Sequence, residues 1–152
     1  MTIAIEMTWV EGADTALGLP QYETAGAAGA DLRANLPDRG SVTLQPMERA
    51  IVPTGLRMAI PLGYEVQIRA RSSMAYKHGI GLPNAPGTID SDYRGPVGAI
   101  MINFGTESYT IHHGDRIAQM VVAPVVQADF SAVSALSDTA RGEGGFGSTG
   151  KS

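Results

Sequence analysis

The chain has 152 residues, a formal net charge of −4 and no cysteine. This length indicates one domain, and the lack of cysteine excludes disulfides, thiolate nucleophiles and cysteine-bound zinc. The negative charge argues against a long polyanion such as DNA as a partner. Charged residues make up only 17%, beside 19 glycines and 9 prolines, a composition that favours many short strands and tight turns.

The first residues contain no basic segment followed by a long apolar run, so we expect no signal peptide. No stretch approaches the ~20 consecutive apolar residues of a membrane span. We therefore expect a cytoplasmic protein without a membrane partner.

Alternation of apolar and polar residues predicts strands in the first half of the chain. Ile3, Ile5, Met7 and Trp9 share one face of a predicted strand at residues 2–10. Further strands are expected at residues 30–34, 41–44, 47–52, 54–60 and 64–70, the last with the clearest alternation.

The second half contains one predicted helix. In the segment 71–79 a serine can cap a short helix of one or two turns, and Gly79 can end it. More strands are expected at residues 97–104, 109–111 and 117–126. His112 and His113 are expected in an exposed turn, and because neighbouring side chains point to opposite faces of a strand we expect no joint metal site. The pattern indicates an all-β sandwich or barrel.

The chain divides into a predicted β domain at residues 1–138 and a flexible, Gly-rich C-terminal arm at residues 139–152. One interpretation of the arm is a frayed terminus. The other is a lid in which Arg141, Ser148 and Thr149 contact phosphates and Phe146 stacks on a base. Ordering ten residues costs about 10–20 kcal/mol of backbone entropy, and a triphosphate nucleotide offers enough contacts to offset it.

Residues 81–95 combine glycines and prolines with Asp90, Asp92 and Tyr93, and we predict a rigid β-hairpin that presents a carboxylate and an aromatic ring. Along a strand, Asp90 and Asp92 could share one face. An aspartate is normally ionised at neutral pH, so it can accept a proton from water or hold the hydration shell of magnesium. The alternative is a turn in which the carboxylates accept backbone N–H groups.

Two other polar clusters allow both a binding and a structural interpretation. Arg71, Ser72 and Ser73 stand at the start of the predicted helix, where free N–H groups and a guanidinium bind anions. The alternative is an ordinary Ser cap beside a solvated Arg. Gln119 interrupts an apolar strand, and its amide needs partners from a ligand or from the backbone at the edge of the core.

Together with Asp31 and the small residues before it, these clusters resemble, in order, the five motifs of the trimeric deoxyuridine triphosphatases (dUTPases). The matching segments are residues 28–34, 71–79, 87–95, 114–120 and 141–150. The resemblance implies a jelly-roll-like homotrimer with shared active sites that hydrolyses dUTP to dUMP and pyrophosphate with Mg²⁺. Such an activity limits uracil in DNA and supplies dUMP for dTMP synthesis.

The resemblance also implies a role for each motif residue. Asp90 would be the base for the water that attacks the α-phosphorus, and Asp31 would contact Mg²⁺ indirectly, through water. The substrate-binding residues that it implies are Arg71, Ser72, Ser73, Asn84, Gly87, Thr88, Ile89, Tyr93, Gln119, Arg141, Phe146, Gly147, Ser148 and Thr149.

These substrate-binding residues would divide the ligand between them. Asn84 and the backbone that follows it would read uracil, and Tyr93 would pack on the deoxyribose and exclude a 2′-hydroxyl. The second motif and Gln119 would hold phosphates, while the arm of one subunit closes over the site of another. Phe146 would then lie on uracil.

The sequence departs from the family pattern at two positions, Ser73 where the family usually has Gly and Pro96 where an acidic residue is common. Neither removes a predicted catalytic group. The first alternative is a dCTP deaminase or a bifunctional deaminase–dUTPase on the same fold, although no extra Glu stands beside the third motif. The second alternative is a non-catalytic, nucleotide-binding β trimer.

Overall fold

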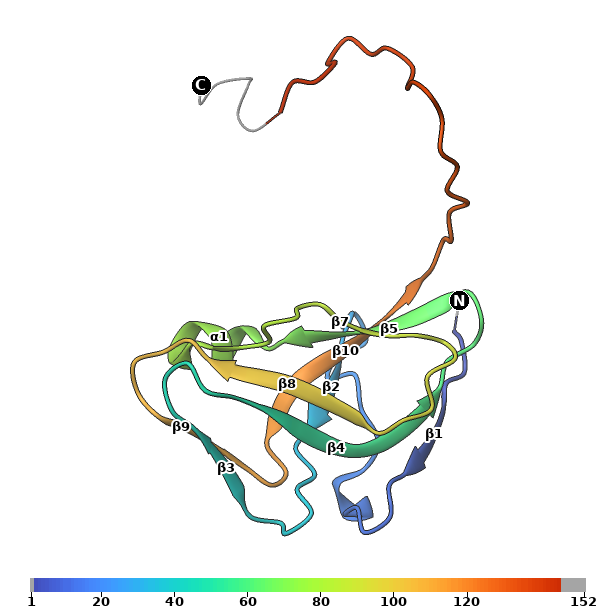
Figure 1. The fold of residues 1–152 in the computed structure, drawn as a ribbon. Coiled ribbons are helices and arrows are strands. Elements are labelled where there is room, and N and C mark those ends of the chain that lie inside the picture. The colour runs from blue at the N-terminus through green and yellow to red at the C-terminus, as the bar shows by residue number, and fades with distance from the viewer. Residues whose placement is uncertain (1, 146–152) are drawn as a thin grey trace.

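The computed structural model describes residues 2–145, and this part of the chain folds into three antiparallel sheets (Figure 1). The first sheet has the order β1 (Glu6–Trp9), β4 (Arg49–Ala59), β8 (Val97–Asn103) and β6 (Ile80–Gly81). The second has the order β2 (Ala30–Arg33), β10 (Arg116–Pro124), β5 (Tyr64–Ala70) and β7 (Gly87–Ile89). The third pairs β3 (Ser41–Leu44) with β9 (Tyr109–His112). The all-β prediction is confirmed, and a jelly-roll-like sandwich is consistent with this arrangement.

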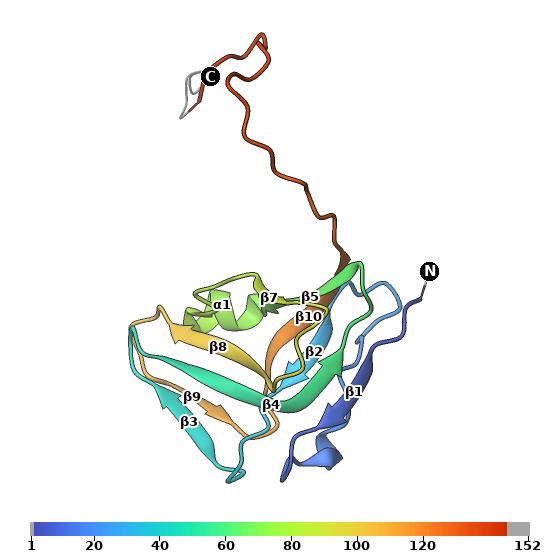
Figure 2. The same ribbon diagram turned by 45° about the vertical axis from the view of Figure 1, so that its right-hand side comes forward.

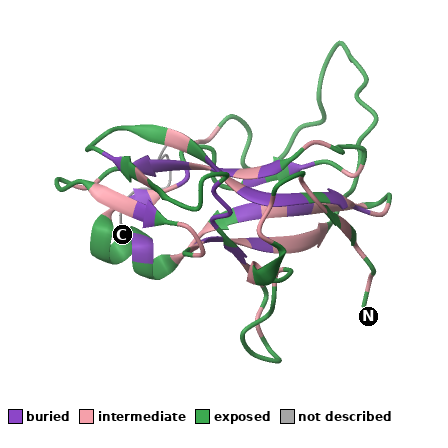
Figure 3. Cartoon of the chain, turned by 90° about the horizontal axis from the view of Figure 1, so that it is seen from below, coloured by how far each residue is buried: buried purple, intermediate pink, exposed green. Residues whose placement is uncertain are grey.

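The core lies between the two larger sheets. Val52 and Met101 enter it from the first sheet, and Leu32, Val66 and Ile117 enter it from the second; each is at most 1% exposed. In Figure 3 much of the buried chain, in purple, lies along strands. Burying a side chain of this size contributes about 1.5–3 kcal/mol, so the core fixes how the two sheets face each other.

The alternation predicted for the first strand is confirmed. Ile3, Ile5, Met7 and Trp9 are half-buried, whereas the residues between them are exposed. The regular strand covers only Glu6–Trp9, where β1 pairs with β4.

The two strands predicted at residues 47–52 and 54–60 are one strand, β4, and that prediction was wrong. The register on β8 shifts between Pro53 and Leu56, which is a β-bulge. Gly55 has φ 71° there, a left-handed conformation that favours glycine. A Cβ at Gly55 would lie 2.7 Å from Nδ2 of Asn35, so the strand continues through a bend that only glycine fits.

The predicted helix is confirmed as α1 (Ser72–His78), but the predicted Ser cap is not. Arg71 occupies the N-cap position and makes no capping bond with its side chain. At the other end Gly79 has φ 69°, and its N–H bonds the carbonyl of Ala75, which is the expected glycine C-cap. A short 3₁₀ helix, η1 (Thr15–Leu17), was not predicted.

The β-hairpin predicted at residues 81–95 is wrong. β6 pairs with β8, whereas β7 pairs with β5, so this segment crosses from one sheet to the other. Pro83 and Pro86 lie between the two strands, and proline cannot donate the hydrogen bonds that a hairpin ladder needs. β7 ends at Ile89, so the strand argument for a shared face of the two aspartates does not apply.

His113 is not in an exposed turn, contrary to prediction, because only 13% of its side chain is exposed. The N–H of Leu36 donates to its Nδ1 at 3.0 Å. In the neutral ring the proton therefore sits on Nε2, which donates to Oδ2 of Asp14 at 3.2 Å. The partners lie far away in the chain, so the local sequence gave no sign of this contact.

After β10 the described chain leaves the body of the molecule (Figures 1 and 2). Residues 125–145 contain turns but neither helix nor strand. The boundary at residue 138 stays a prediction, although the last strand already ends at Pro124. The site residues predicted at 146–149 lie outside the described residues. Within residues 2–145, no helix has the length and apolar character that crossing a membrane requires.

Candidate active site

The segment between β6 and β8 lines a pocket of about 230 Å³. Six of the predicted site residues line it: Asn84, Gly87, Thr88, Ile89, Asp90 and Tyr93. They meet because β7 is anchored on β5, while the chain on both sides of β7 returns to the first sheet. The structure thus brings together the residues predicted to bind the base, to contact the sugar and to activate water.

Backbone contacts hold the acidic end of this pocket in shape. The N–H of Tyr93 donates to the carbonyl of Asp90 at 3.1 Å, and the Tyr93 hydroxyl donates to the carbonyl of Pro96 at 3.1 Å. A Cβ at Gly95 would collide with the Tyr93 ring. Among the described residues, neither the Asn84 amide nor the Asp90 carboxylate makes a side-chain hydrogen bond, so both polar groups are available to a ligand.

Gly87 lets the walls of the pocket approach each other closely. It faces Ile68 across the β5–β7 ladder. A Cβ at Gly87 would lie 3.3 Å from Cβ of Ile68 and 3.4 Å from Nδ2 of Asn84. A side chain here would push on the amide predicted to read a base.

A second group of predicted residues lies at the other end of β5, where Arg71 follows the strand. Its Nε lies 3.3 Å from Oδ1 of Asp31, and its Nη1 donates to the carbonyl of Arg116 at 3.0 Å. Nη1 of Arg116 donates to Oδ2 of Asp31 at 3.0 Å and lies 3.5 Å from Oε1 of Glu23. The four side chains form a chain of alternating charge.

Arg71 and Ser73 border an open pocket of about 420 Å³ that is rich in cations. Its lining includes Arg33, Lys77 and Arg116, with Asp115 as its one carboxylate. Ser72 is exposed at the first helical position. Such an excess of positive charge around a concave surface suits an anion such as a phosphate.

Gln119 lies beside this group on β10. Its Nε2 donates to the carbonyl of Ala70 at 3.1 Å, so the backbone interpretation of this amide holds in the described structure. In the sheet it pairs with Asp31 on one side and Arg69 on the other. A Cβ at Gly29 would collide with the Gln119 amide, which explains the glycine at this position before β2.

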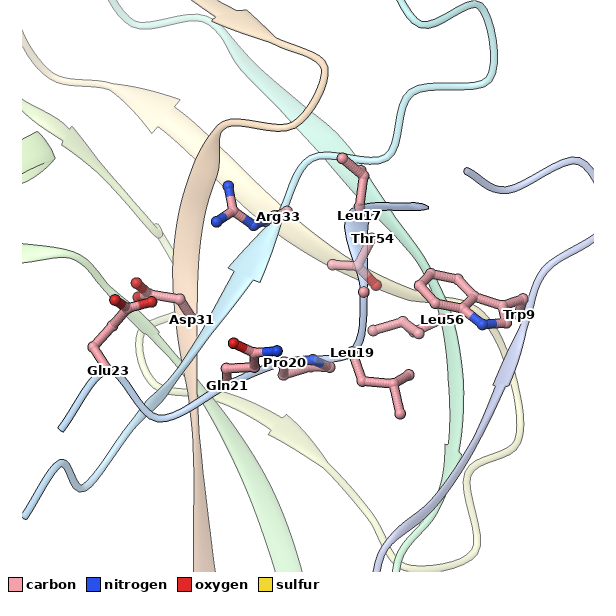
Figure 4. Close-up of a pocket in the computed structure, with 11 residues that line it drawn as sticks. Trp9, Leu17, Leu19, Pro20, Gln21, Glu23, Asp31, Arg33, Thr54 and Leu56 are labelled. Carbon is pink, nitrogen blue, oxygen red and sulfur yellow. The ribbon is translucent and has the colours of Figure 1, made fainter. Parts of the chain in front are cut away.

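On the other side of β2, Asp31 borders a small pocket of about 80 Å³ (Figure 4). In Figure 4, Trp9, Leu19 and Leu56 gather at one end of it, and Asp31 and Glu23 lie at the other. Asp31 is the one predicted site residue in this lining.

Arg141 is not brought to either pocket by a described contact. Its Nε donates to the carbonyl of Gly144 at 2.7 Å, inside the same turn. Sequence reasoning also missed the side chain of Arg116 as a partner of Asp31 and that of Glu23 as a partner of Arg116. Arg116 lies within the fourth motif, but nothing in the local sequence marks Glu23, which precedes β2 by several residues.

A dUTPase family model matches residues 16–150. The chain belongs to the dUTPase family. It is 66% identical to a deoxyuridine 5′-triphosphate nucleotidohydrolase of Roseobacter denitrificans, over 97% of each chain. It is 63% identical to the protein of that name from Dinoroseobacter shibae, over 99% of each chain.

The fold is also similar to a solved structure of a dUTPase. The dUTPase of Staphylococcus bacteriophage 80alpha, a G164S mutant with dUpNHpp, superposes with a TM-score of 0.84 at 25% identity. The match covers 99% of this chain and 100% of the phage chain. In this dUTPase family member, the second and third motifs thus border two pockets whose linings have no residue in common.

Proposed function

We propose that this chain hydrolyses dUTP to dUMP and pyrophosphate, with Asp90 as the base for the water that attacks the α-phosphorus. The observation that carries the proposal is the pocket that joins Asn84, Asp90 and Tyr93 in one wall. A carboxylate without a side-chain partner, next to a pocket of nucleoside size, is placed to take a proton from water. Family membership supplies the substrate.

In this proposal the pocket distinguishes the nucleoside by shape and by hydrogen bonds. The Asn84 amide and the backbone from Gly87 to Ile89 read uracil, because a donor and an acceptor in fixed order reject cytosine. The close packing around Gly87 leaves no space for the methyl group of thymine. Sites that hydrogen-bond their substrate discriminate more strongly than apolar pockets. The Tyr93 ring packs on the deoxyribose and excludes a 2′-hydroxyl.

The phosphates bind on the cationic side of the protein, to Arg71, Ser72, Ser73 and Gln119. Because the chain belongs to the dUTPase family and its motifs resemble those of the trimeric members, we infer that a complete site combines the two pockets from different copies of the chain, in a homotrimer. The arm of another copy closes this site with Arg141, Phe146, Gly147, Ser148 and Thr149. The segment after β10 supports this, because it leaves its own body (Figure 1).

Magnesium fits the donor groups if the substrate phosphates hold most of it. Among residues 2–145, no three His, Cys, Asp or Glu side chains cluster closely enough to cage a metal ion, and Mg²⁺ commonly binds phosphates with one or two carboxylates and several waters. Each Asp31 oxygen contacts one guanidinium and keeps a lone pair for a metal-bound water. When bound, Mg²⁺ would neutralise phosphate charge and polarise the phosphoryl group.

The proposal is tested by measuring pyrophosphate release from dUTP, dTTP, dCTP and UTP at equal concentrations with Mg²⁺. We expect turnover of dUTP and little turnover of the other three. Ammonia release from dCTP would overturn the choice of hydrolase over deaminase. Binding of dUTP without release of pyrophosphate would instead indicate a non-catalytic trimer.

This activity would remove dUTP before polymerases incorporate uracil into DNA, and it would supply dUMP for dTMP synthesis. We propose that the enzyme acts on small nucleotides in the cytoplasm.

A further inference from the structure

We propose that Arg116 is a positioning residue for the phosphate-binding Arg71 and that it acts through Asp31. This inference rests on the proposed function of the same site. It assigns a task to the side chains of Arg116 and Glu23, for which the resemblance implies no role.

The first step is the geometry of Asp31. Its carboxylate bridges two guanidinium groups, with Oδ1 at 3.3 Å from Nε of Arg71 and Oδ2 at 3.0 Å from Nη1 of Arg116. The side chain is only 16% exposed. A carboxylate that bridges two cations at low exposure is more strongly oriented than a solvent-facing one, because water screens it less.

The second step is the geometry of Arg71. Nε faces Asp31, and Nη1 donates to the carbonyl of Arg116. Within the described part of the chain, Nη2 makes no hydrogen bond. Two contacts therefore fix the plane of the guanidinium, and the free N–H groups of Nη2 are left for a phosphate oxygen. Arg116 contributes to both contacts, once through its carbonyl and once through Asp31.

The third step is charge. Without the Arg116 side chain, Asp31 would keep one cation instead of two and could rotate toward Arg71 or toward a metal-bound water. Glu23 contacts the same Nη1 of Arg116 from the outside at 3.5 Å, and Figure 4 draws Glu23 next to Asp31. The exposed Glu23 thus restrains Arg116, which restrains Asp31, which orients Arg71.

The test uses the full-length protein and the variants Arg116→Met, Arg116→Lys and Asp31→Asn, with Arg39→Met as the matched control. Arg39 forms a longer ion pair with Asp14 at 3.8 Å and lines neither candidate pocket, so its loss removes the same charge without removing a contact of Asp31. Thermal unfolding of each variant shows whether it is folded. Both the kinetics of dUTP hydrolysis and the binding of α,β-imido-dUTP and dUMP are measured.

We expect Arg116→Met to lower kcat/KM for dUTP by about 10- to 100-fold, mainly through KM, as displaced binding groups do. We expect it to weaken the binding of α,β-imido-dUTP more than the binding of dUMP, because Arg71 is proposed to hold phosphates and not the nucleoside. Arg116→Lys should restore part of the loss, since an ammonium still reaches Asp31. In the Asp31→Asn background the Arg116→Met change should have little further effect, because coupled residues are non-additive.

Equal effects of Arg116→Met and Arg39→Met on kcat/KM would overturn the inference. So would an equal loss of binding for the two nucleotides, or additive effects of the Asp31 and Arg116 substitutions. If the unaltered protein fails to hydrolyse dUTP, the proposed function itself is wrong, and this result is separate from the others.

Discussion

Asp90 and Arg71 carry the two ends of the proposed chemistry, and the protein holds them in different ways. Asp90 stands in a turn that backbone bonds and the Tyr93 hydroxyl maintain. Arg71 is held by a neighbouring carboxylate and a carbonyl. The region of Asp90 therefore depends on chain geometry, and the region of Arg71 depends on paired charges.

The difference teaches which substitutions each region tolerates. Near Asp90, an added methyl group would push apart pocket residues that are already in contact. Near Arg71, loss of one charged side chain would leave its ion-pair partner free to move. The site residues of the first region should therefore mainly affect turnover and nucleoside selection, and those of the second should mainly affect phosphate binding.

The largest effect is expected for Asp90→Asn. The amide keeps the size of the side chain but cannot accept a proton from water, so kcat should fall by about 10²- to 10⁴-fold. Binding of α,β-imido-dUTP should stay within a fewfold of normal. Steady-state kinetics and calorimetric binding measure the two quantities.

Near-normal turnover in Asp90→Asn would remove Asp90 as the base. Asp92→Asn is the matched control, since it lies two residues away and is exposed. A larger loss of turnover in Asp92→Asn than in Asp90→Asn would indicate that Asp92, and not Asp90, is the base.

Removal of residues 141–152 should affect both regions at once. We expect a folded protein whose kcat/KM for dUTP is lower by about 100-fold, because closure positions the substrate and excludes water. Size-exclusion chromatography and thermal unfolding check the fold, and pyrophosphate release measures the activity. Full activity of the shortened chain would show that the arm is only a frayed end.

Gly87→Ala tests the idea that the nucleoside pocket depends on close backbone approach. The new Cβ would press on Ile68 and Asn84 at 3.3 and 3.4 Å, and such overpacking typically costs about 1–3 kcal/mol. We expect kcat/KM for dUTP to fall by about tenfold, with a smaller effect on thermal stability.

The matched control is Gly81→Ala, whose Cβ would meet the Phe104 ring at an ordinary 3.5 Å. Equal kinetics for the two variants would show that Gly87 does not shape the pocket.

The sequence predicted those features that depend on neighbours in the chain. Alternation marked β1 and β5, and Gly79 marked the end of α1. Residues between Asn84 and Tyr93 line one pocket, and the sequence indicates this grouping because they are close in the chain.

Features set by distant partners were not predicted. Prolines and glycines at residues 81–95 signal turns, but they do not say that β6 pairs with β8 and β7 with β5. Two separate strands were predicted at residues 47–52 and 54–60, whereas β4 runs through both ranges with a bulge between Pro53 and Leu56. Glu23 and Arg116 meet only because β2 and β10 are neighbours in the sheet.

The smallest effect on catalysis is expected at Asp14, which lines neither candidate pocket and serves as a reference for both regions. The hydrogen bond from His113 is the main cause that lowers the pKa of the Asp14 carboxyl, with help from the N–H of Ala16 and the charge of Arg39. A lowered folded-state pKa stabilises the protein above the unfolded value, about 3.9 for Asp, and this stabilisation is lost as the pH falls through the folded value.

Asp14→Asn should therefore lower the free energy of unfolding at pH 7, and the difference from the unaltered protein should shrink below about pH 4. Urea unfolding at several pH values measures it, with Asp129→Asn in the exposed segment after β10 as the control. The kcat for dUTP should be unchanged at pH 7. A stability difference that grows on acidification would contradict the assigned sign. A loss of turnover would show that the His113–Asp14 contact supports the site, so that Asp14 is no neutral reference for the two regions.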